Sequence, residues 1–120
     1  MPYSPINLQD KLTLFTEHWS PKIIAQMNDY HFKLAKVQGE LTWHKHPTTD
    51  ELFLVLKGTL RIDFRDGFVE LQPGELFVVP KGTEHITSAV EECHLLFVDP
   101  AGEANTGDAG GEKTAQDQWI

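Results

Sequence analysis

Short apolar runs, separated by turn residues, fill the chain between residues 22 and 99. Within residues 59–65 apolar side chains alternate with charged ones, which is the pattern of a half-buried strand. Residues 52–56 are apolar at every position, so we expect this strand to be covered on both faces. Asp66 and Gly67 between two such runs predict a tight hairpin. The predicted strands are residues 22–27, 30–37, 40–46, 52–56, 59–65, 68–71, 76–79, 85–89 and 94–98.

These runs predict an all-β domain. Eight or nine short strands at close, regular spacing are typical of an antiparallel barrel or sandwich. No long amphipathic helical pattern competes with this prediction. Ahead of the strands, Leu8, Leu12 and Phe15 have roughly helical spacing, which predicts a short helix within residues 7–18.

The chain divides into an N-terminal segment, a strand domain and a C-terminal segment, at residues 1–21, 22–99 and 100–120. Its 120 residues are the length of one domain. Residues 101–111 are rich in Gly, Ala, Asp and Glu, which is typical of a flexible segment. The chain nevertheless ends on the apolar Trp119 and Ile120. Two interpretations stay open: a disordered terminus, or a tail whose end docks on its own barrel or a partner's.

The composition narrows the possible partners. A formal net charge of -8 argues against nucleic acid and against an anionic membrane surface, because both need a basic face. No apolar run has the length of a membrane span. The one cysteine, Cys93, forms no internal disulfide. With no signal-peptide pattern at the N-terminus, we expect a cytoplasmic protein.

Two histidines and a glutamate are the first candidate metal ligands. His44 and His46 are two positions apart in a predicted strand, so both rings project from one face. By the same alternation Glu51 shares a face with Phe53 and Val55, and a lone carboxylate at an apolar interior is costly unless it is paired or metal-bound. The spacing of the pair alone also fits ordinary surface histidines.

His85 follows 34 positions after Glu51 and would join the other three only through the fold. Three imidazoles and one carboxylate form a mixed nitrogen and oxygen site for one divalent Fe, Mn, Ni, Co, Zn or Cu per chain. The absence of cysteine ligands argues against a closed structural zinc site.

One stretch of the chain resembles the first motif of the cupin superfamily, which is a glycine, His-x-His, a glutamate and a second glycine. The matching positions are Gly39, His44, His46, Glu51 and Gly58. The sequence departs from the motif in having four residues, instead of five, between the first glycine and the first histidine.

A second stretch resembles the second cupin motif through Gly74, Pro80, Gly82 and His85. Here Ala89 stands where the motif usually has asparagine, which removes no ligand. Residues 105–108, Asn-Thr-Gly-Asp, resemble the tail of a group of small bacterial cupins that is often labelled mannose-6-phosphate-isomerase-like. The resemblance implies an antiparallel double-stranded β-helix, or jelly-roll barrel, with one metal held by the four residues.

The superfamily includes dioxygenases, isomerases, decarboxylases, lyases and binding proteins, so the fold does not settle the function. We expect a metal-dependent enzyme acting on a small oxygen-rich metabolite, with a non-catalytic binding module as the alternative. A sugar-phosphate isomerase ranks third, because Lys45, Arg61 and Arg65 are predicted to point away from the ligands. No general base is assigned, and no role is given to Tyr30, His18, His31 or His94.

Strand parity also predicts a core and an exposed apolar face. Leu52, Leu54 and Leu56 face away from the interior and need a cover, either the N-terminal segment or a second subunit. We expect a homodimer. The predicted barrel core is Phe53, Val55, Phe64, Phe77, Val79 and Phe97.

Overall fold

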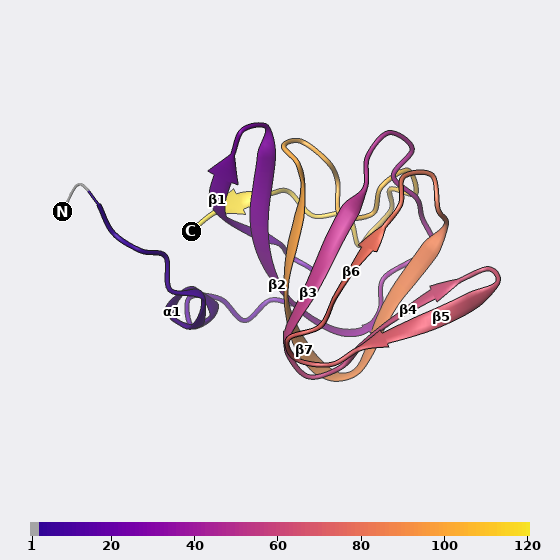
Figure 1. Cartoon of the computed structure of the whole chain (residues 1–120), viewed down its shortest axis with the longest axis horizontal. Helices are drawn as coiled ribbons and strands as arrows, with labels where there is room; N and C mark the ends of the chain where they lie inside the picture. Colours follow the sequence, from indigo (N-terminus) through magenta and orange to yellow (C-terminus); the bar gives the residue numbers. More distant parts are fainter. Residues whose placement is uncertain (1–2) are drawn as a thin grey trace.

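The computed structural model describes residues 3–120, and its regular secondary structure is almost entirely β-strand (Figure 1). A short helix, α1 (Leu8–Leu12), precedes them, and no helix of the described residues is long and apolar enough to cross a membrane. The strands are β1 (Lys22–Met27), β2 (Tyr30–Glu40), β3 (Glu51–Lys57), β4 (Leu60–Phe64), β5 (Gly67–Leu71), β6 (Leu76–Val79), β7 (His85–Pro100) and β8 (Gln118–Trp119).

One sheet curls around the core, with strand order β5-β4-β7-β2-β1-β8 and with β3 joining β7 to β6. The long strand β7 changes partner along its length, because residues 85–88 pair with β4 and residues 94–98 pair with β3. Every pairing is antiparallel except the one between β1 and β8. Within the described residues the sheet wraps around the core without closing. The predicted all-β antiparallel class with a short N-terminal helix is confirmed.

The inward faces of β2, β3, β4 and β7 form the main core. Phe53, Val55, Val79 and Phe97 are buried in it, as predicted. The predicted core residues Phe64 and Phe77 are only partly buried and pack against its rim.

A second cluster lies between the N-terminal segment and the outer side of the sheet. Leu12 and Phe15 pack there with Ile24 and Leu34, and Leu56 contacts the same cluster. The N-terminal segment therefore covers one of the three outward leucines of β3.

The predicted strand over residues 40–46 is wrong. Strand β2 ends at Glu40, and beyond it His44 forms only an isolated bridge with His85. Strand β3, which follows this segment in the chain, bonds to β6 and β7. The reason is that the backbone of Lys45 bonds to Asp108 of the C-terminal segment, so residues 44–46 lie between the sheet and that segment.

Other element boundaries also differ from the predictions. The two predicted last strands are one strand, β7, which continues through an exposed bend around Val90 with a register shift opposite it. The hairpin turn is Arg65-Asp66, one residue earlier than predicted. The helix is shorter because the backbone N–H groups of Thr13 and Leu14 bond three residues back, which tightens and ends it.

The C-terminal segment packs against the same chain's sheet. Asn105 and Thr106 are buried, and β8 pairs with β1. The backbone N–H of Ile120 donates to the Ile23 carbonyl. Of the two interpretations left open by the sequence, the structure has the docked tail.

Candidate functional site

The structure brings the four candidate ligands together at one end of the main core. His44 and His46 come from the segment between β2 and β3, Glu51 opens β3, and His85 opens β7. All four side chains are buried, and one ligand atom from each lies within 4.8 Å of the others. Three separate parts of the chain therefore supply one cluster.

Hydrogen bonds orient each imidazole in the same way. The Nδ1 atom of His44 lies 2.8 Å from the Thr42 carbonyl oxygen, and that of His85 lies 2.9 Å from the Thr83 carbonyl oxygen. A carbonyl oxygen only accepts, so both Nδ1 atoms donate, and in the neutral form of each ring Nε2 carries the lone pair. The third ring, His46, places Nδ1 3.1 Å from Oε1 of Glu103.

The inward atoms of the cluster lack hydrogen-bond partners. Nε2 of His46, Nε2 of His85 and Oε1 of Glu51 are buried without one. The carboxylate Oε1 lies 3.2 Å from the first nitrogen and 3.7 Å from the second, close enough for charge interaction but not aligned as hydrogen bonds. Buried polar atoms without partners are rare in proteins, and three converging on one point fit a metal ion.

The charge state of the cluster is set by burial and by mutual contact. Burial disfavours the Glu51 carboxylate, but His46 and His85 outweigh it and hold the pKa of Glu51 at about 2. Burial likewise opposes a charge on His46, and the two glutamates beside it raise its pKa to about 9. Burial lowers the pKa of His44. Without a metal, the buried carboxylate is thus balanced by the His46 cation, whose proton a metal would displace.

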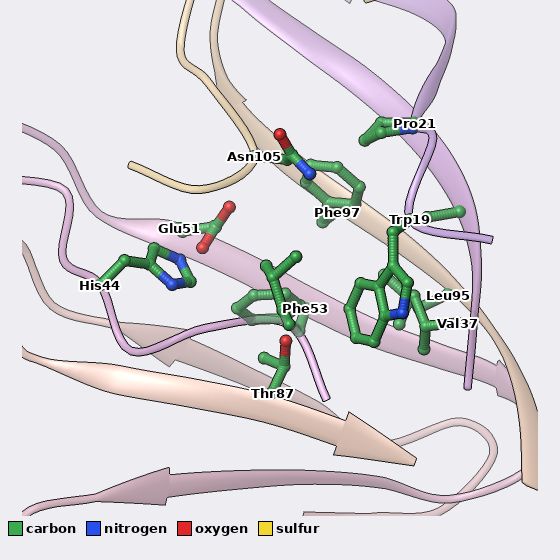
Figure 2. Close-up of a pocket in the computed structure, with 12 residues that line it drawn as sticks. Trp19, Pro21, Val37, His44, Glu51, Phe53, Thr87, Leu95, Phe97 and Asn105 are labelled. Atoms are coloured by element: carbon green, nitrogen blue, oxygen red, sulfur yellow. The ribbon is translucent and has the colours of Figure 1, made fainter. Parts of the chain in front are cut away.

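A small, mostly apolar cavity lies directly beside the cluster (Figure 2). His44 and Glu51 stand at one end and Trp19 at the other. Its volume of about 30 Å³ is enough for one or two water molecules, since a single water needs about 10–15 Å³. The remaining lining side chains are Pro21, Ala35, Val37, Leu41, Phe53, Thr87, Leu95, Phe97 and Asn105.

Trp19 closes the cavity in a strained backbone conformation. Its φ angle of 59° is in the left-handed region, which bulky residues rarely adopt. Two hydrogen bonds to β2 hold it there, from the backbone N–H to the Lys36 carbonyl at 2.9 Å and from Nε1 to the Gln38 carbonyl at 3.0 Å. The sequence predictions missed Trp19, because nothing in the local pattern marks it.

The other histidines lie outside the cluster. The exposed His18 and the largely buried His94 flank Glu92, with Nε2 to carboxylate distances of 2.7 and 3.1 Å. His31 contacts Gln26 and the Trp119 ring. Tyr30 is half exposed and is not a lining residue of the cavity.

The cationic side chains considered for phosphate binding are engaged elsewhere. Arg61 pairs with Asp63, and Arg65 pairs with Glu84 and lies over the Trp43 ring. Among the described residues, the lining of the cavity includes no lysine or arginine.

Comparisons with known proteins find relatives of similar sequence and fold. The uncharacterized protein YdbB of Bacillus subtilis (strain 168) is 46% identical over 77 residues, which are 63% of this chain and 68% of that protein. A crystal structure of a cupin-2 domain containing protein from Shewanella frigidimarina NCIMB 400 is 56% identical, covers 79% of this chain and 93% of its own, and superposes with a TM-score of 0.79.

A second solved structure, protein NMB1881 from Neisseria meningitidis, is 30% identical with a TM-score of 0.74 and covers 82% of this chain and all of its own. The sequence profile of the Cupin domain matches residues 30–99, which is more than half of the chain and includes all four candidate ligands. The protein is therefore a member of the cupin family.

Proposed function

We propose that this protein binds one divalent transition metal per chain through His44, His46, Glu51 and His85, and that it acts on a small oxygen-bearing molecule held beside the metal. The observation that carries the proposal is the convergence of buried, partnerless ligand atoms on one point. A metal in such a site would act as a Lewis acid toward an oxygen of the ligand.

The residues of this chain would position the ligand. Phe53 and Phe97 form apolar walls, so the part of the bound molecule facing away from the metal would be apolar. Because the cavity of about 30 Å³ holds only one or two waters, a larger molecule would enter only as lining side chains move aside. Besides the candidate metal ligands His44 and Glu51, the polar side chains of the described lining are Thr87 and Asn105. The Asn105 amide is already bonded to the C-terminal segment. The Thr87 hydroxyl is thus the side-chain group free to orient a bound molecule.

The proposed site is compatible with three reaction classes: dioxygenation, isomerisation, and decarboxylation or another lyase reaction. The alternative is a non-catalytic module that binds a small molecule, and it is favoured by the lack of a general base among the described lining residues other than the ligands themselves. A sugar-phosphate isomerase ranks last, because a phosphate in this cavity would meet no cationic side chain of the described lining.

The test is metal content by elemental mass spectrometry on untagged protein. We expect about one transition metal per chain in the wild type and almost none in a His44→Ala, His46→Ala double variant, because each change removes a ligand. The matched control is a His18→Ala, His31→Ala double variant, which removes two imidazoles outside the cluster and should keep the metal. A wild type that binds no metal, even after reconstitution, would contradict the proposal.

The nature of the bound metal then directs the activity screen. Iron would direct it to oxygen consumption with small hydroxylated aromatic or enol compounds, and zinc or manganese to isomerising or decarboxylating reactions. A loaded protein that turns over nothing but binds such compounds would support the binding module.

We also propose a homodimer formed through the open apolar face of the sheet. Leu52 and Leu54 lie on this face, where the exposed fractions of Leu76 and Val78 are 57% and 44%. A second copy carries the same apolar patch, so a two-fold contact would bury both patches at once. The face consists of Met27, Tyr30, Phe32, Leu52, Leu54, Leu76, Val78, Leu96 and Val98, with Asp50 at its edge.

A further inference from the structure

The ligand segment, residues 44–46, is held by contacts that lie far away in the sequence. It belongs to no regular strand, and its only ladder contact among the described residues is the His44 bridge with His85. The His46 carbonyl accepts from the Gly82 N–H at 2.9 Å. Both backbone groups of the middle residue, Lys45, bond to Asp108. The Lys45 N–H donates to Oδ1 of Asp108 at 2.9 Å, and its carbonyl accepts from the Asp108 N–H at 3.1 Å.

Two more contacts from the C-terminal segment reach the ligand side chains themselves. Oε1 of Glu103 lies 3.1 Å from Nδ1 of His46, the ring nitrogen that does not face the other candidate ligands. Gly107 packs so closely that an added Cβ would lie 2.9 Å from Cδ2 of His44 and would collide with the Lys45 carbonyl oxygen.

The C-terminal segment is itself anchored at several points. Lys33, which is fully buried, donates to the Glu103 carbonyl and lies 3.0 Å from a carboxylate oxygen of Asp117. The Asn105 amide bridges the Lys113 carbonyl and the Ala115 N–H, which fixes the loop between them. The contacts on residues 44–46 are thus made by an ordered, pre-positioned segment.

From these contacts we propose that residues 103–108 hold the metal ligands in position. Glu103 is the positioning residue of His46, and Asp108 and Gly107 fix the backbone between the two histidines. The inference rests on the proposed metal binding. Carboxylates bonded to the far nitrogen of a metal-ligating histidine fix its ring orientation, and their loss typically weakens metal binding about 10–100-fold.

The first test compares Glu103→Ala with Glu103→Gln in the full-length protein. Co²⁺ is the probe, with its dissociation constant measured by competition with a chelator and its visible absorption spectrum recorded at saturation. We expect Glu103→Ala to bind Co²⁺ about 10–100-fold more weakly, with an altered spectrum. Glu103→Gln should recover most of the affinity, because an amide oxygen accepts the same Nδ1 hydrogen bond.

The second test uses two glycines whose positive φ angles would strain any other residue, and which differ in their surroundings. Gly107 and Gly110 have φ angles of 54° and 62°, but an added Cβ has nothing within 4 Å at the second position. Gly110→Ala therefore controls for backbone strain. We expect Gly107→Ala to weaken Co²⁺ binding at least tenfold and Gly110→Ala to bind as the wild type does.

Each outcome has a distinct meaning. If the wild type binds Co²⁺ and both Glu103→Ala and Gly107→Ala bind it with the same affinity and spectrum, this inference is overturned and the proposed function stands. If the wild type binds no metal, the proposed function fails and the inference falls with it. Should Gly107→Ala fail to fold, as judged by circular dichroism, the two Glu103 variants decide alone.

Discussion

At the scale of single residues, Asp99 is a carboxyl group with no exposed surface, held 3.1 Å from the equally buried Nζ of Lys33. Burial raises the pKa of Asp99 to about 7 although Lys33 opposes the shift. In the unfolded chain an aspartate titrates near about 3.9. Between these values the folded protein binds more protons than the unfolded chain, so the free energy of unfolding falls as pH rises from about 4 to about 7.

Asp99→Asn keeps the shape of the side chain and removes its titration. We expect urea unfolding at pH 5 and pH 7.5 to show a smaller loss of stability in the variant than in the wild type. The difference is at most about 3 kcal/mol, since about two pKa units separate pH 5 from the pKa of Asp99 and each corresponds to about 1.4 kcal/mol. Asp63→Asn, at a partly exposed ion pair, is the control. Equal pH dependence in the wild type and Asp99→Asn would refute the assignment.

At the scale of elements, the turn between β3 and β4 packs into the bend of β7. Gly58, in this turn, has a φ of 82°, and an added Cβ would lie 2.9 Å from the Glu92 carbonyl oxygen and 3.2 Å from Cα of Cys93. The approach coincides with the place where β7 leaves β4 and joins β3. Glycine is therefore required here for two reasons, its backbone conformation and its lack of a side chain.

The two reasons are separable with Gly74, whose φ is 85° and whose added Cβ would have nothing within 4 Å. Gly74→Ala should cost about 1–2 kcal/mol of unfolding free energy through backbone strain alone. Gly58→Ala should cost about 1–3 kcal/mol more, because the sheet must also shift to admit the methyl group. Urea midpoints of both variants measure the difference, and equal losses would show that the close approach to β7 is unimportant.

At the scale of the whole molecule, one part of the sheet's outer face is covered by the N-terminal segment and another part is open. The N-terminal segment covers the first part through Leu12 and Phe15, and Leu56 lies under this cover. Leu52 and Leu54 lie beyond it, on the open apolar face. The sequence offered the N-terminal segment and a second subunit as alternative covers. The first covers Leu56, and we propose the second for Leu52 and Leu54.

Val78→Lys places a charge in the middle of this face. We expect the wild type to be a dimer by light scattering coupled to gel filtration, and the variant to be a monomer, because a buried unpaired ammonium is costly. Val90→Lys is the matched control, since Val90 is 94% exposed and lies outside the face. A monomeric wild type, or a Val78→Lys variant that remains dimeric, would contradict the proposed interface.

The sequence by itself determined the fold class and the cluster of candidate ligands. Period-two alternation and turn residues are local signals, so they predicted the all-β class and most strands without any long-range information. The candidate ligands were identified by two short motifs, the first of which contains His44, His46 and Glu51. His85 was placed by its motif alone, and the structure brings it to the other three.

Only the tertiary structure decided how the ligands are supported and what shapes the cavity. Glu103 contacts His46 across 57 positions, and Asp108 contacts Lys45 across 63. Trp19 closes the cavity from the N-terminal side in a conformation that no local pattern favours. The physical reason is the same in each case: a hydrogen bond or a close contact between distant segments depends on the assembled sheet, and it leaves no periodicity in the sequence of either partner.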